Sequence, residues 1–314
     1  DVVAERLQMT PDALVAEINE ARAALYAARQ QRPPPLRDDK LLTAWNGLMI
    51  SALARAGFGL AEDRYLAAAG RAAGFVLQEA RQGERLARHV TGGVKGPPGF
   101  LDDYAFMIQA LLDLYEATGH WRWLEQAIGL QTLVDRELWD DAQGGYFFTV
   151  ASPDLLVRDK PDYDGAEPAG NSVAALNLLR LAELTDRRDL RAHAERVLAA
   201  FARPLHAGLA LPKMLSALAF YLSEPAQVVL VRPQAARDFA PLVDSLRRAF
   251  LPHSVRVLVQ ENDAAHAALV PLSAQRPVLS GRVTAYVCRG KVCKLPAQDA
   301  DTLAAELNAA PPSS

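Results

Sequence analysis

The chain has 314 residues, of which half are hydrophobic and 23% are charged, and its formal net charge is −3. This composition supports one large domain or two smaller domains with true hydrophobic cores. No basic block stands out and no apolar run approaches the ~18 residues that span a bilayer, so neither nucleic acid nor a membrane is an expected partner.

No signal peptide is visible in the amino end, "DVVAERLQMTPDALVAEINEARAAL", which is charged and has a helical pattern. The chain starts at Asp1 and not at methionine, so we expect further sequence upstream. Two cysteines in a chain of this size do not make a disulfide scaffold, and the cytoplasm is therefore the expected location.

Apolar residues recur at helical spacing through most of the first 220 residues. The first predicted helix begins at Thr10-Pro11, a capping residue followed by proline at the first helical position, and ends before three consecutive prolines. The predicted helices span residues 11–31, 40–57, 62–80, 101–118, 121–138, 170–185, 188–203 and 212–222.

These helices are of two kinds. Some are apolar on nearly every side, such as "WNGLMISALARA", "YAFMIQALLDLYEA" and "NSVAALNLLRLAEL", which is typical of helices buried between other elements. Others carry arginine and glutamate on a broad face, such as "WRWLEQAIGLQTLVDREL". The two kinds alternate, which favours an α/α toroid with inner helices lining a barrel and outer helices around it. An ordinary bundle or solenoid is the alternative.

The pattern changes twice along the chain. Aromatic and β-branched residues predict a β-hairpin over residues 145–149 and 155–158, between an outer and an inner helix. After Pro225, the stretches "AQVVLVR" and "SVRVLVQ" read as strands, separated by a helix in "AARDFAPLVDSLRRAF". A strand pair in "VTAYVCRGKVCKLP" and a helix in "DADTLAAELNAA" follow. We therefore predict a toroid domain over residues 1–224 and a small α/β domain over residues 225–314.

The cysteines Cys288 and Cys293 fall in the predicted strand pair, on either side of a turn at Arg289-Gly290. Their C-x4-C spacing is neither the redox C-x-x-C motif nor a zinc pattern. The turn allows them to face each other. Two ordinary hairpin cysteines are the favoured interpretation, and a regulatory disulfide is the alternative.

Polar residues gather at the amino ends of the three apolar helices. Because the inner helices of a toroid run parallel, these ends meet at one mouth of the barrel. Capping is the simple explanation for any one cluster, since Asp and Asn are favoured N-caps. The full set comprises Asp38, Asp39, Lys40, Trp45, Asn46, His89, Asp102, Asp103, Tyr104, Asp162, Asp164, Glu167 and Asn171.

Carboxylates, amides and aromatic rings together suit a sugar-binding pocket, and paired carboxylates serve as acid and base in glycoside cleavage. Asp103 or Asp102 would be the acid or base, and only one of them is expected to face the cavity because neighbours on a helix point about 100° apart. Their catalytic partners would be Asp39 and Glu167. The expected substrate-binding residues are Trp45, Asn46, Lys40, His89, Tyr104, Asp164 and Asn171, with Trp45 and Tyr104 as ring platforms.

No cofactor or metal ion is expected at this mouth, because the chain has neither a phosphate-binding loop nor calcium-loop spacing. The positions of the histidines argue against a sugar epimerase. Such an enzyme needs bases on both faces of a carbon, usually histidines, and only His89 lies near the predicted mouth.

Five stretches of the chain carry a resemblance to a known family: "DDKLLTAWNGLMISALARAG", "FLDDYAFMIQALLDLYEATG", "WDDAQGGYFFT", "RDKPDYDGAEPAGNSVAALNLLRLAELT" and "AYVCRGKVC". In these stretches the chain resembles the spermatogenesis-associated, thioredoxin-domain-containing family. Ala169 stands where the family pattern leads us to expect serine. The resemblance implies an amino-terminal thioredoxin-like domain followed by a six-hairpin toroid similar to glycosidases and N-acylglucosamine 2-epimerases. This chain lacks the thioredoxin-like segment and has too few helices for six hairpins. It therefore resembles the carboxy-terminal part of such a protein, with an incomplete toroid.

The resemblance implies a fold and no reaction. Two functions stay open. The first is a carbohydrate-binding or carbohydrate-processing protein, with glycosidase-like or epimerase-like activity undecided and a small saccharide as its ligand. The second is a non-catalytic scaffold that works with a thioredoxin-like domain absent from this chain. The abundance of Ala, Arg and Leu favours a bacterial source with a GC-rich genome.

Overall fold

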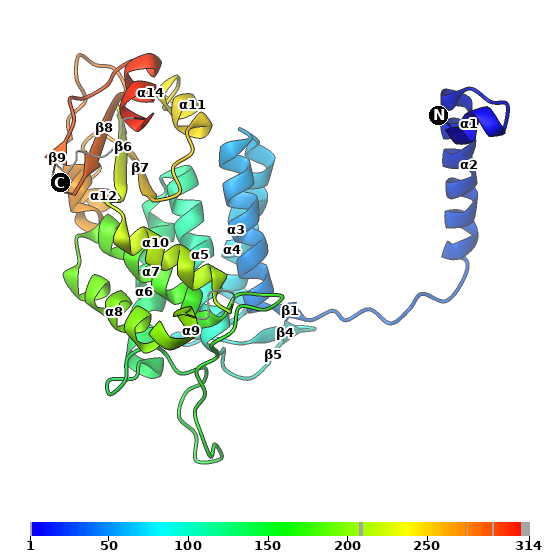
Figure 1. The fold of residues 1–314 in the computed structure, drawn as a ribbon, viewed down its shortest axis with the longest axis horizontal. Coiled ribbons are helices and arrows are strands. Elements are labelled where there is room, and N and C mark those ends of the chain that lie inside the picture. Colours follow the sequence, from blue (N-terminus) through cyan, green and yellow to red (C-terminus); the bar gives the residue numbers. More distant parts are fainter. Residues whose placement is uncertain (1, 207–209, 275, 291, 309–314) are drawn as a thin grey trace. The chain divides into compact units, whose positions relative to one another are not determined.

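The computed structural model describes residues 2–206, 210–274, 276–290 and 292–308, and the chain divides into two compact units, Asp1–Asp39 and Lys40–Ser314. The first unit contains α1 (Val2–Arg6) and α2 (Pro11–Gln30). The side chain of Thr10 accepts a hydrogen bond from the Ala13 amide at 3.2 Å, and Pro11 opens α2. This helix therefore begins where its capping residues predict (Figure 1).

The second unit starts with a row of helical hairpins. Each predicted helix is present with its ends within three residues of the predicted ones, and the short α9 is an addition. The elements are α3 (Thr43–Gly59), α4 (Asp63–Glu79), α5 (Leu101–Thr118), α6 (Trp121–Leu138), α7 (Gly170–Thr185), α8 (Arg188–Ala200), α9 (Ala202–His206) and α10 (Pro212–Leu222).

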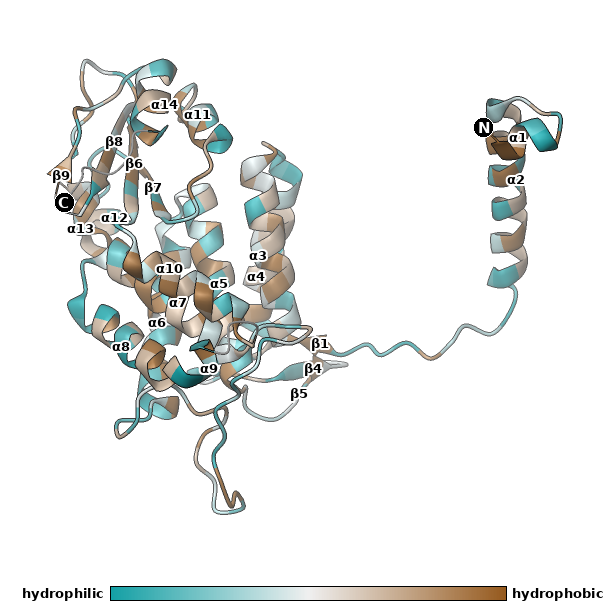
Figure 2. Cartoon of the chain, in the orientation of Figure 1, coloured by the Kyte–Doolittle hydropathy of each residue, from teal (hydrophilic) through white to brown (hydrophobic). Residues whose placement is uncertain are grey.

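Inner and outer helices differ as their sequences predict. The inner helices α3, α5, α7 and α10 pack side by side in that order, and α4, α6 and α8 pack outside them. In α5, 16 of 18 residues are buried, whereas α4 buries only Ala69, Ala73 and Val76 on one face. Figure 2 shows the same contrast between the more hydrophilic α8 and the hydrophobic α10. The fold is thus an arc of an α/α toroid followed by α/β structure.

A glycine allows the inner helices α3 and α5 to approach closely. A Cβ atom at Gly47 would lie 2.7 Å from the backbone carbon of Phe106, which is closer than real Cβ atoms come. Any side chain here would push the two inner helices apart. Gly47 in "WNGLM" therefore serves helix packing.

Short strands lie at the end of the row of helical hairpins where the inner helices start. One sheet has the order β1-β4-β5, from β1 (Leu41–Leu42), β4 (His89–Thr91) and β5 (Val94–Lys95). A separate hairpin joins β2 (Arg81–Gln82) and β3 (Arg85–Leu86).

The hairpin predicted over residues 145–149 and 155–158 is wrong, because these residues form irregular loop. The two sides of the loop are still held together. Arg158 donates from Nε and Nη2 to the Thr149 carbonyl at 3.0 and 2.7 Å, and the Phe148 amide donates to the Asp159 carbonyl at 2.8 Å. The Arg158 side chain and a single backbone hydrogen bond thus stand where a hairpin would have a ladder of backbone bonds.

The α/β part has a four-stranded sheet of order β7-β6-β8-β9, in which β6 and β7 are parallel and the other pairs are antiparallel. Its elements are β6 (Ala226–Arg232), α11 (Leu242–Arg248), β7 (Ser254–Gln260), α12 (Ala264–Leu269), α13 (Pro271–Ala274), β8 (Thr284–Arg289), β9 (Val292–Cys293) and α14 (Ala300–Asn308). The predicted strands and helices occur in the predicted order, and the short helices α12 and α13 between β7 and β8 were not predicted. The helix α11 is shorter than predicted because it begins only after Pro241.

Strand β7 packs against α5 and α7, so the sheet and the inner helices belong to one compact unit. The domain boundary between residues 224 and 225 stays a prediction. The last two residues of the predicted final helix, Ala309 and Ala310, lie outside the described residues. None of the described helices is both long enough and apolar enough to cross a membrane.

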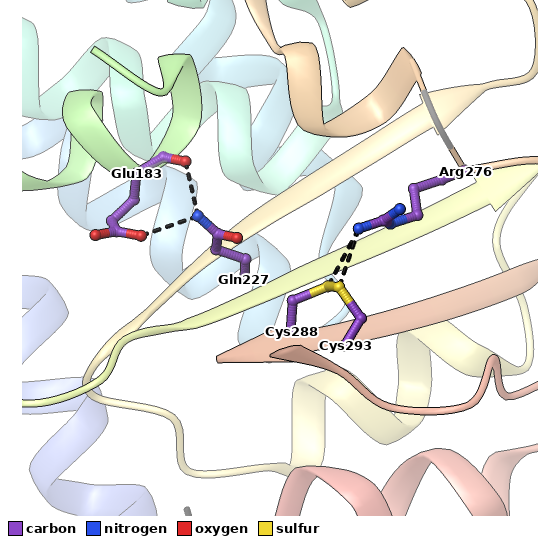
Figure 3. Close-up of a disulfide and its surroundings, with 5 residues drawn as sticks. All are labelled: Glu183, Gln227, Arg276, Cys288 and Cys293. Atoms are coloured by element: carbon purple, nitrogen blue, oxygen red, sulfur yellow. Dashed lines mark hydrogen bonds between the residues drawn. A yellow bond between two sulfur atoms is a disulfide. The ribbon is translucent and has the colours of Figure 1, made fainter. Parts of the chain in front are cut away.

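The two cysteines form a disulfide, as Figure 3 shows. Cys288 on β8 lies directly opposite Cys293 on β9, and Arg276 Nη2 donates to their sulfur atoms at 3.5 and 3.0 Å. The favoured interpretation of two ordinary cysteines is therefore wrong. The turn at Arg289-Gly290 is where it was predicted, and pairing across it brings the sulfur atoms together.

Candidate functional site

The amino ends of α3, α5 and α7 meet, as the sequence predicts for parallel inner helices. Asp103 at the start of α5 accepts a hydrogen bond from the Ala44 amide at the start of α3, at 3.0 Å. A Cβ atom at Gly170, the first residue of α7, would lie 2.7 Å from the Leu101 side chain and 3.2 Å from Asp102 Oδ1. We call these three helix starts, with the loop over residues 162–169, the rim.

An exposed tryptophan stands at the rim. Trp45 is 61% exposed, and its Nε1 donates to Glu167 Oε2 at 2.9 Å. This bond spans the rim from α3 to the loop before α7. An indole ring that is held in place and open to solvent is a ready surface for the apolar face of a ligand.

Asp102 is the half-buried carboxyl group of the rim. Its pKa is raised to about 6, chiefly by burial and then by the neighbouring charges of Asp103 and Glu167, while Arg88 acts in the opposite direction. A carboxyl group with this pKa holds a proton in mildly acidic solution and can transfer it.

Asp103 has a structural role. It is 1% exposed, and its two oxygens accept from the Ala44 amide at 3.0 Å, the Phe100 amide at 2.8 Å and Arg88 Nη1 at 3.3 Å. Burial raises its pKa to about 6, although these three donors act to lower it. The contacts show what this side chain does, since they join the starts of α3 and α5. Between the two aspartates, it is Asp102 that remains available.

The side chains of three other candidates are also engaged in hydrogen bonds to the backbone. The Tyr104 ring is buried and its hydroxyl accepts from the Leu86 amide at 3.1 Å, so it is no ring platform. Asp164 accepts from the Ala169 and Lys213 amides, both at 2.8 Å. Asn171 is fully buried and bonds both the amide and the carbonyl of Tyr146 at 2.8 Å. These residues hold loops against helices.

The remaining candidates lie around the rim or away from it. Asn46 donates from Nδ2 to the Leu42 carbonyl at 2.8 Å, and the His89 ring lies against Gly96, where a Cβ atom would come within 2.5 Å of it. Lys40 is exposed at the start of the second unit. Asp39 belongs to the first unit, where it forms an ion pair with Arg37.

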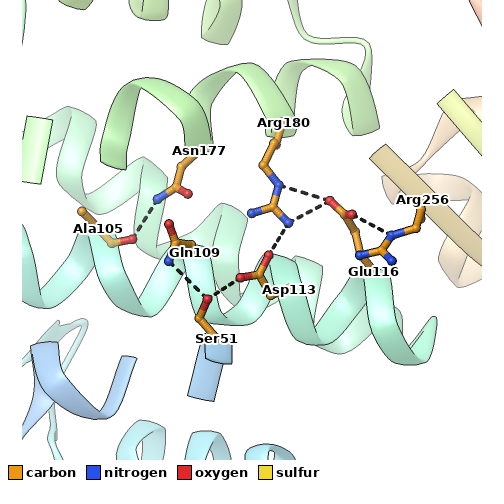
Figure 4. Close-up of polar contacts among 8 residues, drawn as sticks. All are labelled: Ser51, Ala105, Gln109, Asp113, Glu116, Asn177, Arg180 and Arg256. Carbon is orange, nitrogen blue, oxygen red and sulfur yellow. Dashed lines mark hydrogen bonds and ion pairs between the residues drawn. The ribbon is translucent and has the colours of Figure 1, made fainter. Parts of the chain in front are cut away.

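A buried ionic network lies farther along the inner helices, and it was not predicted (Figure 4). Arg180 on α7 donates from Nη2 to Asp113 Oδ1 at 2.7 Å and to Glu116 Oε1 at 2.8 Å, both on α5. Ser51 on α3 donates to Asp113 Oδ2 at 2.5 Å. Arg256 on β7 donates from Nε to Glu116 Oε2 at 3.3 Å. The network thus ties three inner helices to the sheet.

The sequence does carry a signal for this network. Gln109, Asp113 and Glu116 follow one another at spacings of four and three residues on an otherwise apolar helix, and such spacing places them on one face. The many apolar residues of α5 obscure this polar stripe in the sequence.

A cavity of about 310 Å³ adjoins the network where the inner helices end. Its lining includes Arg55 and Phe58 of α3, Asp113 and Glu116 of α5, Arg180 of α7, Phe220 of α10, and the residues Leu246, Arg247, Ala249, Phe250, Leu251, Pro252, Ser254 and Arg256 of the α/β part. In the described part of the chain, no group of three or more His, Cys, Asp or Glu side chains could hold a metal ion.

Relatives are found among animal proteins. The chain is 37% identical over 319 residues to human spermatogenesis-associated protein 20, and 36% identical over the same span to the rat protein. An uncharacterised protein of Caenorhabditis elegans is 33% identical over 291 residues. The human alignment covers 95% of this chain and 40% of the relative, so the chain spans about two fifths of the length of the curated relatives it matches. No family model matches the chain.

Among solved structures, the chain is similar to a GH76 α-mannanase from Bacteroides thetaiotaomicron, with a TM-score of 0.44 and 17% identity over 53% of this chain and 45% of that one. It is also similar to a cellobiose 2-epimerase from Spirochaeta thermophila, with a TM-score of 0.44 and 18% identity over 52% of this chain and 44% of that one.

Proposed function

We propose that this chain, a homologue of spermatogenesis-associated protein 20 that matches a C-terminal part of that protein, binds a carbohydrate at the rim. The observation that carries the proposal is the pairing of the exposed Trp45 ring with Glu167, beside the half-buried Asp102. Ring faces cover the apolar side of a pyranose, and carboxylates accept hydrogen bonds from its hydroxyl groups.

The rim also has the groups for glycoside chemistry. Asp102, with a pKa raised to about 6, would donate a proton to a leaving oxygen. Glu167 would be the second carboxylate, and Asp103 would position Asp102 by holding the start of α5 against α3. The proposed activity is therefore that of a carbohydrate-processing enzyme, with Asp102 as the acid. We place it in the cytoplasm and in carbohydrate metabolism, in a protein of bacterial origin.

A second function is favoured by how many rim residues the fold already uses. Asp103, Asp164 and Asn171 all bind backbone amides, as residues of a scaffold would. In this alternative the helical arc is a non-catalytic module that presents a partner to a thioredoxin-like domain elsewhere in the longer protein.

The two functions are separated by a ligand screen on the purified chain. Melting temperatures would be measured with mono- and disaccharides, because a ligand that binds the folded state raises them by mass action. We expect a sugar-specific rise that is lost in Trp45→Ala and kept in Trp121→Ala, a matched control at the start of the outer helix α6. The variant Asp102→Asn should bind the sugar and lose turnover.

A well-folded chain with no response to any saccharide would overturn the carbohydrate proposal and favour the scaffold. If Trp45→Ala and Trp121→Ala lost sugar binding equally, the sugar would not bind specifically at the rim.

A further inference from the structure

The cavity at the far end of the inner helices is rich in arginine. Four guanidinium groups line it, those of Arg55, Arg180, Arg247 and Arg256. We call it the cationic cavity. It lies within the second unit, so its walls belong to one compact body.

Most of these cations have a fixed counter-ion. Arg180 is shared between Asp113 and Glu116, at 2.7 and 2.8 Å. Arg256 reaches the second oxygen of Glu116 at 3.3 Å. Arg247 pairs with Asp244 at 2.7 Å, outside the lining. Three of the four arginines thus share three carboxylates, and one positive charge is left over.

The charge left over is that of Arg55. Among the residues that the structure describes, none forms a hydrogen bond or an ion pair with its guanidinium, although it lines the cavity and is exposed. An arginine with five donors and no acceptor is ready for an anion, which it can bind through two parallel hydrogen bonds.

Arg256 is close to the same point of α3. Its guanidinium lies 4.2 Å from the centre of the Phe58 ring, and Phe58 is three residues beyond Arg55 on α3. Residues three apart on a helix are neighbours on its surface. Two guanidinium groups are therefore placed at the last turns of α3, both facing the cavity.

We propose that the cationic cavity binds a small organic anion, with its carboxylate or phosphate group held between Arg55 and Arg256. The volume of about 310 Å³ suits a compound of about monosaccharide size. Phe58, Leu176 and Phe220 supply apolar wall against which the body of such a compound packs.

The neighbouring lysine is consistent with an excess of positive charge. The pKa of Lys213 is lowered first by burial and then by the charges of Arg180 and Arg55. An anion at Arg55 would relieve this repulsion. This site is at the opposite end of α3 from Trp45, roughly 15 Å away at 1.5 Å per residue, so it does not depend on the rim.

A different role for the same cations is to complement the carboxyl ends of α3, α5 and α7, where the helix dipole is negative. That role requires no ligand. The two roles make opposite predictions for anion binding, so one titration separates them.

The test is calorimetric titration of the purified chain at low ionic strength with glucose 6-phosphate, glucuronate, inorganic phosphate and, as the neutral probe, glucose. We expect binding of at least one anionic sugar and none of glucose at this site. Arg55→Gln should weaken that binding at least tenfold, because it removes the unpaired cation. Arg64→Gln on α4 is the matched control, since Arg64 is an exposed arginine away from the cavity lining.

Each outcome decides a point. Preference for glucose 6-phosphate or for glucuronate identifies the anionic group, and binding of inorganic phosphate alone would reject the apolar wall as part of the site. Absence of binding by every anion, or equal affinity in Arg55→Gln and Arg64→Gln, would overturn the proposal. Trp45→Ala should leave anion affinity unchanged, so that failure of the rim and failure of the cationic cavity can be told apart.

Discussion

Trp45 and Glu167 are 122 residues apart in the chain, and a hydrogen bond of 2.9 Å joins the indole nitrogen of one to the carboxylate of the other. The bond connects the start of the first inner helix to the loop before the third. It turns separate helix ends into one surface, on which the half-buried Asp102 is a neighbour of Glu167. The proposed carbohydrate site depends on this connection.

The adjacent aspartates of the rim should respond in opposite ways to the same substitution. Asp103→Asn should lower the free energy of unfolding by about 2 kcal/mol at pH 7, because asparagine cannot replace both acceptor oxygens of a buried carboxylate. Asp102→Asn should raise it by about 1 kcal/mol, since it removes a charge that burial disfavours. Urea denaturation of both variants at pH 7 measures the two changes.

The pH dependence checks the Asp102 result. Its pKa is raised in the fold, so the folded state binds the proton more tightly and stability falls as pH rises from about 4 through about 6. The advantage of Asp102→Asn should therefore disappear near pH 4. An advantage of the same size at pH 4 and pH 7 would contradict this explanation.

Arg180 should be among the most sensitive positions of the second unit. Arg180→Leu leaves the buried carboxylates Asp113 and Glu116 without their shared cation, which costs about 3–5 kcal/mol of unfolding free energy. Arg191→Leu, at a partly exposed ion pair on α8, is the control and should cost less than about 1 kcal/mol. Chemical denaturation of both variants tests the contrast, and equal losses would show that the network adds little.

His266 should make the protein less stable in acid. It is 1% exposed and bonds the Tyr115 hydroxyl at 2.7 Å through Nε2, and burial lowers its pKa to about 4. The imidazole is thus neutral in the fold, and stability from this group is lost as pH falls from about 6.5 to about 4. Asp102 and Asp103, whose pKa values are raised, add stability as the pH falls and so act against the effect of His266. The contribution of His266 is therefore measured as the difference between the unaltered chain and His266→Gln.

The expected result is a shallower loss of stability in His266→Gln than in the unaltered chain over this pH range. Denaturation midpoints at pH 4.5 and pH 7 measure it. Parallel changes in the two proteins would mean that His266 does not titrate as its burial predicts.

Reduction of the disulfide should weaken the end of the sheet. The bond between Cys288 and Cys293 closes a short loop, for which chain entropy predicts a stabilisation of about 2 kcal/mol. Treatment with a thiol reductant should lower the melting temperature of the unaltered chain and leave Cys288→Ala/Cys293→Ser unchanged. If the reductant has no effect on the unaltered chain, the pairing is not formed in solution.

Local sequence determines the secondary structure of this protein to a large extent. Helix spacing, Pro11 and the prolines before α3 place the helix ends, because periodicity and capping act between residues a few positions apart. The hairpin predicted after residue 144 fails for a reason outside that range. Arg158 binds a carbonyl nine residues away, and no local propensity reports such a bond.

The rim likewise has features that the local sequence determines and features that depend on contacts between distant residues. The sequence by itself places aspartates, a tryptophan and amides at three helix starts, and it predicts that those starts meet. Only the tertiary structure decides which side chains the fold uses, as it does Asp103 and Tyr104, and which stay open, as do Trp45 and Asp102. It likewise brings Arg180 to Asp113 and Glu116 across 67 and 64 residues. The physical reason is that burial and ion pairing depend on packing between distant helices, whereas capping and periodicity are complete within one.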